Sequence, residues 1–186
     1  MAPKIWVRVP TKLTIIHLMR KDQIILISPT HGKLKIPQVV DKIDEFITTH
    51  PGDYKFIVGT DSQVYNGTVL FVTVFVVHRI GKGAVYFYRK NKVSKKYSLA
   101  DRMFTEACYS MDLASKIVEE IHDKGCTFCD DITKLEIHVD VGRNGETRDV
   151  INGVVGMVKG NGFKCELKPN AYGASHVADR HTKDKR

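Results

Sequence analysis

The chain has 186 residues, 42% hydrophobic and 27% charged, so it can bury a full core and is typical of one globular domain. Basic residues exceed acidic ones by 29 − 21 = 8, which favours an anionic partner, with nucleic acid as the first candidate. The uncharged run at 23–32 is too short for a membrane span, which needs about 20 residues. Charges at Lys4, Arg8 and Lys12 interrupt any signal-peptide core. We therefore expect a cytoplasmic protein.

The sequence pattern in the first half of the chain predicts one helix and three strands. Residues 1–27 mix β-branched and basic side chains, and we expect either an extra hairpin or an N-terminal extension there, with the main domain at 28–186. Apolar side chains recur at helical spacing after Pro37, which predicts a helix as far as about His50. Strands are predicted at 55–61, 69–78 and 84–89, where β-branched and aromatic residues are separated by Asn66-Gly67 and by a glycine-rich turn. These three strands should form an antiparallel meander.

The second half of the chain alternates helix and strand. Ser98 is a candidate N-cap for a long helix at 99–124, and Ser175 opens a last helix. Between them we expect the elements strand 135–141, helix 146–159 and strand 163–167. This order predicts an α/β fold with a five-stranded mixed sheet flanked by helices, three antiparallel strands being followed by parallel ones. Right-handed crossovers would place the fourth strand beside the first.

Glu106 interrupts the apolar stripe of the long predicted helix. The other members of that stripe follow at spacings of three and four residues and are Met103, Ser110, Leu113, Ile117 and Ile121. A carboxylate on a core-facing stripe is costly unless it is paired, hydrogen-bonded or bound to a metal. The alternative is that Glu106 reaches solvent or supports the first turns of the helix electrostatically.

Three further carboxylates are expected near Glu106. Asp61 and Asp140 stand at the C-terminal ends of two predicted neighbouring parallel strands, at the edge where ligands bind in open α/β sheets. Asp179 would join them if the last helix packs over that edge. Taken singly, Asp61 could be a turn residue and Asp179 could be exposed to solvent. Together the four repel one another unless a cation is present, which predicts a Mg²⁺ or Mn²⁺ site.

Four segments of the chain resemble the ribonuclease H-like superfamily, and within it the YkuK-type family of predicted nucleases. The segments are Val58-Gly-Thr-Asp-Ser-Gln63, Arg102-Met-Phe-Thr-Glu106, His138-Val-Asp-Val-Gly142 and Ser175-His-Val-Ala-Asp179. Ser28-Pro-Thr-His-Gly-Lys33 is similar to the opening of the family region, so the resemblance covers roughly 28–184. It implies a catalytic set that binds two divalent ions, here Asp61, Glu106, Asp140 and Asp179. For the fourth position His176, His181 or Asp184 stay open, and His176 or His181 could transfer a proton.

Nucleic acid is the partner that this resemblance implies, as RNA or an RNA-containing duplex. The basic run at 89–96 would contact phosphates, although a solvated loop is the alternative. Candidate nucleic-acid-binding residues are Ser62, Gln63, Arg89, Lys90, Lys92, Lys95, Lys96, Arg143 and Asn144. The expected activity is metal-dependent phosphodiester hydrolysis, and the alternative is a related binding module with little or no activity.

Two other motifs are weaker. Residues 140–147 are similar to the phosphate loop of actin-like ATPases, but those proteins need two such domains and about twice this length. Cys126 and Cys129 form a CxxC without a second ligand pair of suitable spacing, so reduced cysteines are favoured over a zinc site.

Overall fold

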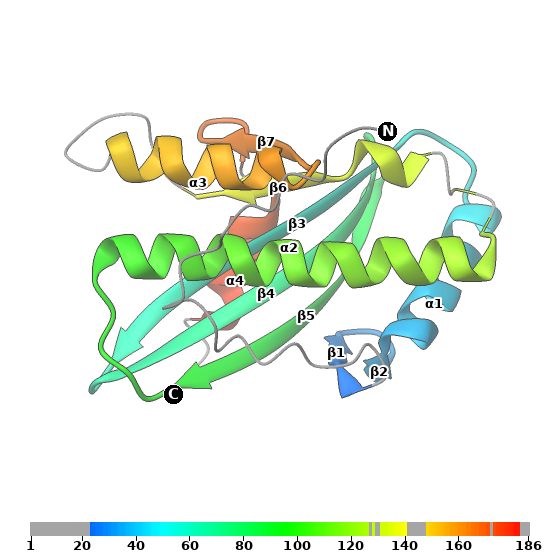
Figure 1. Cartoon of the computed structure of the whole chain (residues 1–186). Helices are drawn as coiled ribbons and strands as arrows, with labels where there is room; N and C mark the ends of the chain where they lie inside the picture. Colours follow the sequence, from blue (N-terminus) through cyan, green and yellow to red (C-terminus); the bar gives the residue numbers. More distant parts are fainter. Residues whose placement is uncertain (1–22, 127, 129–130, 141–147, 172, 183–186) are drawn as a thin grey trace, which may run out of the picture.

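A computed structural model describes residues 23–126, 128, 131–140, 148–171 and 173–182. The centre of the fold is a seven-stranded sheet with the order β2-β1-β5-β4-β3-β6-β7 (Figure 1). Its strands are β1 Ile25–Ser28, β2 Gly32–Lys35, β3 Tyr54–Tyr65, β4 Thr68–Arg79, β5 Gly83–Val93, β6 Glu136–Val139 and β7 Lys164–Leu167.

The predicted mixed sheet is confirmed in its topology. Strands β3, β4 and β5 form the antiparallel meander, and β6 lies parallel to β3, as the right-handed crossover predicts. Strand β7 continues the sheet parallel to β6. The C-terminal ends of β3, β6 and β7 therefore point the same way, and side chains that follow them can gather at one edge.

The predicted number of five strands is wrong, because a short hairpin adds β1 and β2 to the sheet. Strand β1 pairs with β2 and with β5, and Leu26 is fully buried beneath α1. The hairpin spans the boundary that the sequence suggested between 27 and 28. Each of its strands has four residues, which is too short for alternation to be recognised in the sequence. Residues 1–22 lie outside the described part of the chain.

Helices cover both faces of the sheet. On one face lie α1 Ile36–Thr49, α2 Leu99–Lys124 and α3 Arg148–Gly160, together with the short 3₁₀ helix η2 Asp131–Lys134. On the other face lies α4 Gly173–Thr182, behind the sheet in Figure 1, and Ala178 packs there against β3 and β4. No helix in the described ranges is long and apolar enough to cross a lipid bilayer.

Local signals in the sequence set the ends of α2 and the β3–β4 turn. The Ser98 hydroxyl accepts a hydrogen bond from the backbone N–H of Asp101 at 3.1 Å, and Gly125 ends the helix with a φ of +62°. Asn66 and Gly67 both have positive φ, as a two-residue hairpin turn requires. The bounds of α2 therefore coincide with the prediction.

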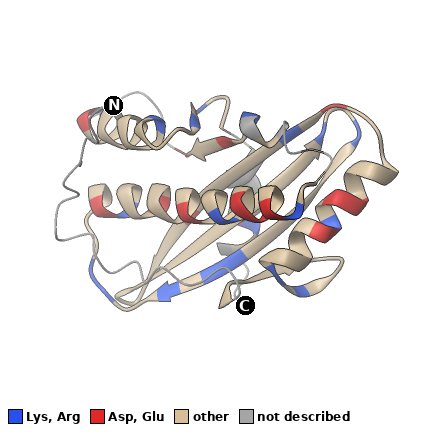
Figure 2. Ribbon diagram, turned by 45° about the vertical axis from the view of Figure 1, so that its right-hand side comes forward, with Lys and Arg blue, Asp and Glu red and all other residues tan. Residues whose placement is uncertain are grey.

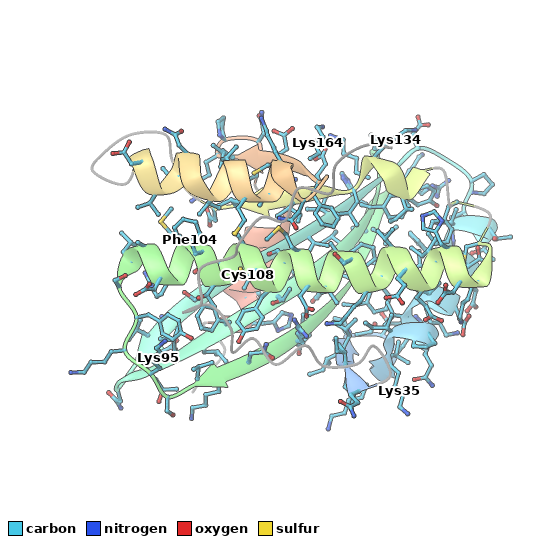
Figure 3. The ribbon with its side chains drawn as sticks, in the orientation of Figure 1. Lys35, Lys95, Phe104, Cys108, Lys134 and Lys164 are labelled. Atoms are coloured by element: carbon cyan, nitrogen blue, oxygen red, sulfur yellow. The ribbon has the colours of Figure 1, made fainter. Side chains whose placement is uncertain are left out.

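Helices α2 and α3 approach each other closely at Gly153. The Phe104 side chain extends from α2 toward α3 (Figure 3), and a Cβ atom at position 153 would stand 3.1 Å from Phe104 Cζ. A larger residue at 153 would therefore require the Phe104 ring to give way by a few tenths of an ångström.

Candidate active site

Asp61 lies where β3 outruns its neighbour β6. Strand β3 pairs with β4 as far as Tyr65, but its pairing with β6 ends at Gly59 opposite His138. Two residues further along each chain stand Asp61 and Asp140. The prediction that β3 ends at Asp61 is wrong, because the Asn66-Gly67 turn lets β3 and β4 continue as a two-stranded extension. The expected position at the C-terminal edge of a parallel pair nevertheless holds.

Glu106 reaches this edge from the opposite face of the sheet. Because side chains alternate along a strand, Thr60 and Ser62 face α2, whereas Asp61 shares the α4 face with Ile57. Ser62 Oγ donates a hydrogen bond to Glu106 Oε1 at 2.6 Å. One turn along α2, Ser110 Oγ lies 2.8 Å from Thr60 Oγ1. These hydroxyl contacts fix α2 on β3 and hold the Glu106 carboxyl beside the strand that carries Asp61.

The electrostatics of Glu106 confirm that it is out of place on an apolar stripe. All the other predicted members of the stripe are at most 3% exposed, and Glu106 itself is only partly exposed. Burial raises the pKa of Glu106 to about 7; the hydrogen bond from Ser62 opposes this rise, and the negative charges of Asp61 and Asp140 add to it. The three carboxyls of β3, α2 and the β6 end therefore form one electrostatic cluster.

Lys168, which the sequence analysis missed, connects Asp179 to this cluster. It follows the end of β7, and its Nζ lies 2.5 Å from Asp140 Oδ1. The hydrogen bond and charge of Asp140 raise the pKa of Lys168, and the charges of Asp179 and Asp61 contribute further. The position after a strand parallel to β6 was the signal that could have identified Lys168, because such strands end at the same edge.

The donor set suits a hard divalent cation. Its four carboxyls come from β3, α2, the end of β6 and α4, and oxygen ligands of this kind are those that Mg²⁺ and Mn²⁺ prefer. The Lys168 ammonium pairs with Asp140, and the charges of Asp179 and Asp61 also favour it, so this edge already attracts a positive charge. Within the described residues, no group of three or more His, Cys, Asp or Glu side chains is arranged closely enough to hold a metal ion. A bound ion would therefore have to draw the carboxyls together.

The predicted basic run divides between two faces of the sheet. Lys90, Lys92, Lys95 and Lys96 are exposed, and Figure 2 shows basic residues along β5. Arg89, in contrast, is 7% exposed and donates a hydrogen bond to Asp112 at 3.1 Å. Its guanidinium is thus engaged inside the protein, and we leave Arg89 out of the proposed nucleic-acid surface.

The remaining predicted residues are placed as follows. Gln63 is half-buried on β3, two residues after Asp61. His181 stacks on Tyr88 with ring centroids 3.8 Å apart, so it lies over β5, two strands away from β3. Outside the described part of the structure lie Arg143, Asn144, Asp184 and the side chain of His176. Cys129 of the CxxC pair also lies outside it.

The sheet order and the helices on both faces define an RNase H-like α/β fold. A family model described as "Ribonuclease H-like" matches residues 38–183, and the chain belongs to this family. The chain is also 29% identical over 170 residues to the "Uncharacterized protein YkuK" of Bacillus subtilis strain 168, a match that covers 87% of this chain and 99% of that protein. The resemblance to a YkuK-type family is thereby confirmed. No solved structure matched the chain significantly.

Proposed function

We propose that the protein is a divalent-metal-dependent nuclease that hydrolyses phosphodiester bonds in RNA or in a duplex that contains RNA. The observation that carries the proposal is the electrostatic cluster of Asp61, Glu106 and Asp140 at the sheet edge, with Asp179 reaching it from α4. Membership of the ribonuclease H-like family supports a nuclease or nucleic-acid-related role. Repelling carboxyls at one edge lower stability, and a structural role would not need them.

In this proposal, Asp61, Glu106, Asp140 and Asp179 hold Mg²⁺ or Mn²⁺. When bound, two such ions supply an activated water and stabilisation for the leaving oxygen. The protein's own groups orient the site: Ser62 holds the Glu106 carboxyl by its hydrogen bond, and Lys168 balances the charge of Asp140. Exposed lysines on β5 would hold the phosphodiester backbone.

A binding module with little or no activity is the second candidate. One observation favours it: the described carboxyls do not stand in a ready-made metal-binding arrangement. The two candidates differ in what they predict for manganese, because a binder that has no metal site gains no stability from the ion.

Manganese titration followed by cleavage assays separates these candidates. At roughly 100 times its Kd, Mn²⁺ should raise the melting temperature of the wild-type protein by about 5 °C or more. Asp61→Asn should abolish this shift, whereas Asp53→Asn, which changes an exposed carboxylate in the loop before β3, should retain it. The variants would then be incubated with labelled single-stranded RNA, RNA duplex, RNA/DNA hybrid and single-stranded DNA.

Each outcome decides between the candidates. Cleavage by the wild type and Asp53→Asn, but not by Asp61→Asn, supports the nuclease. A manganese shift without cleavage of any substrate would support the metal site and contradict the nuclease. If manganese fails to stabilise the wild type, the metal site is wrong and the binding module is favoured.

A further inference from the structure

The β3–β4 extension carries lysines on the same face of the sheet as Asp61. Residues directly opposite each other in an antiparallel sheet point to the same face. The pairing of β3 with β4, and of β4 with β5, aligns two rows across the three strands, Asp61–Val72–Lys90 and Gln63–Leu70–Lys92. Strands β3 and β5 are two spacings apart, so about 10 Å separates the backbone of Asp61 from that of Lys90. This is the face on which α4 packs.

Helix α4 limits this face on one side. Ala178 is fully buried against β3 and β4, and His181 stacks on Tyr88, so the helix spans the sheet from β3 to β5. Next to this stack the Nζ of Lys90 lies 5.9 Å from the centre of the Tyr88 ring. Lys90 and Lys92 are exposed and follow Tyr88 toward the end of β5. A polymer that leaves Asp61 on this face is therefore directed away from α4, along the extension.

A small hollow lies further along the same face. Its volume is about 200 Å³, and it is lined by Tyr65, Asn66, Thr68, Leu70 and Lys92. Tyr65 is 37% exposed although it is a large aromatic residue. The lining combines an aromatic ring, an apolar floor and one cation, and it contains no acidic side chain. An aromatic ring beside a cation is the combination on which an unpaired base stacks while its phosphate is neutralised.

Other basic residues of the same run do not belong to this face. Arg89 points to the α2 side, where it pairs with Asp112. Lys95 projects from the loop before α2, away from the body of the protein (Figure 3), and its Nζ lies 5.3 Å from the centre of the Tyr97 ring. Alternation along β5 therefore selects Lys90 and Lys92 as the lysines that face the substrate.

We propose that the α4 face of the β3–β4 extension binds a single-stranded segment of the nucleic acid next to the cleavage site. Lys90 and Lys92 contact its phosphates, and one base lies against Tyr65 in the hollow. A duplex keeps its bases stacked inside and cannot offer one to such a hollow. This inference rests on the proposed function, because it assumes that cleavage takes place at Asp61 and that the bound strand runs from there along the extension.

Binding measured without metal tests this surface separately from catalysis. Fluorescence anisotropy of a labelled single-stranded RNA, in EDTA and over a range of salt concentrations, would compare the full-length wild type with three lysine variants. Lys90→Ala and Lys92→Ala should each weaken binding several-fold and lower the slope of log K against log salt by about 0.7. Lys82→Ala, in the exposed turn at the opposite end of β4 and β5, is the matched control and should leave affinity and slope unchanged.

Tyr65 provides the test of base stacking. Tyr65→Ala should weaken binding roughly fivefold or more, with no change in the salt slope, because an uncharged contact is lost. Tyr65→Phe keeps the ring and should bind as the wild type does. Unchanged melting temperatures would show that the variants are folded, since Tyr65 and Lys92 are both exposed.

The outcomes separate this inference from the nuclease proposal. If Lys92→Ala and Tyr65→Ala bind single-stranded RNA as tightly as the wild type, or the wild type does not bind it, the surface is wrong whether or not RNA is cleaved. If a blunt RNA duplex binds more tightly and responds to the same substitutions, the single-stranded assignment is wrong. If binding depends on these residues but no cleavage occurs, the surface stands and the nuclease fails.

Discussion

Replacing Glu106 by glutamine should stabilise the metal-free protein at neutral and alkaline pH. The folded protein raises the pKa of Glu106 from 4.5 to about 7. Between these values the folded chain keeps a proton that the unfolded chain loses, so the free energy of unfolding falls as pH rises through this window. At about 1.4 kcal/mol per pKa unit, the wild type loses about 3 kcal/mol between pH 4.5 and pH 7. Glutamine has no such charge and can still accept the hydrogen bond of Ser62.

Urea denaturation in EDTA, followed by circular dichroism from pH 4 to pH 8, measures this effect. We expect wild type and Glu106→Gln to be about equally stable near pH 4 and to diverge by up to about 3 kcal/mol near pH 8. Glu45→Gln is a control in which the pKa shift has the opposite direction, because the hydrogen bond and charge of Lys42 lower the pKa of Glu45. That exposed carboxylate should therefore contribute a small amount of stability above its pKa. A difference between wild type and Glu106→Gln that does not vary with pH would refute the reasoning.

With manganese bound, the wild type should become more stable than Glu106→Gln. A divalent ion requires the ionised carboxylate, so its stabilising effect on the wild type should grow between pH 6 and pH 8. Glu106→Gln should lose most of this gain, although it is the more stable protein in EDTA. If manganese stabilises both proteins equally at pH 8, Glu106 is not a ligand.

Three further substitutions test other parts of the structure. Asp112→Ala leaves two buried cations without their partner and should cost about 3–5 kcal/mol of unfolding free energy in urea, whereas Glu45→Ala in an exposed pair should change it little. Lys168→Met removes the ammonium that competes with a metal ion for Asp140. Isothermal titration calorimetry should therefore show that the affinity for Mn²⁺ rises by up to about fivefold. Weaker binding of Mn²⁺ would mean that Lys168 supports the site. Ser98→Ala removes the N-cap of α2 and should cost about 1 kcal/mol, seen as a lower urea midpoint, and an unchanged midpoint would contradict the capping role.

Much of the fold could be predicted because its signals are local. The cap at Ser98 and the spacing of apolar residues define α2, and the Asn66-Gly67 turn defines the β3–β4 hairpin. The apolar stripe of α2 also revealed Glu106 as an exception, since burial on a helix follows from a period of 3.6 residues. An extra hairpin was expected only as one of two alternatives for residues 1–27, and its bounds were not predicted, because four-residue strands carry too little pattern and depend on pairing with β5.

The candidate site could likewise be predicted only in part from the sequence. From sequence alone, Glu106 could be singled out because it breaks the apolar stripe of its helix, and Asp61 and Asp140 because they stand at the C-terminal ends of two predicted strands. Whether they share an edge depends on which strands pair and in what register, and these contacts join residues far apart in the chain. Lys168 enters the cluster only through the pairing of β7 with β6.

The sequence by itself determined the α/β class, the order of the main elements and three candidate carboxylates, one on an apolar helical stripe and two at strand ends, since all of these depend on near neighbours in the chain. Only the tertiary structure decided that β3 continues beyond β6, that Arg89 is buried, and that Lys90 and Lys92 share a face with Asp61. A one-residue change of register would send every side chain of a strand to the opposite face. The face that a residue occupies is therefore set by pairing across the sheet, which the pattern within one strand does not specify.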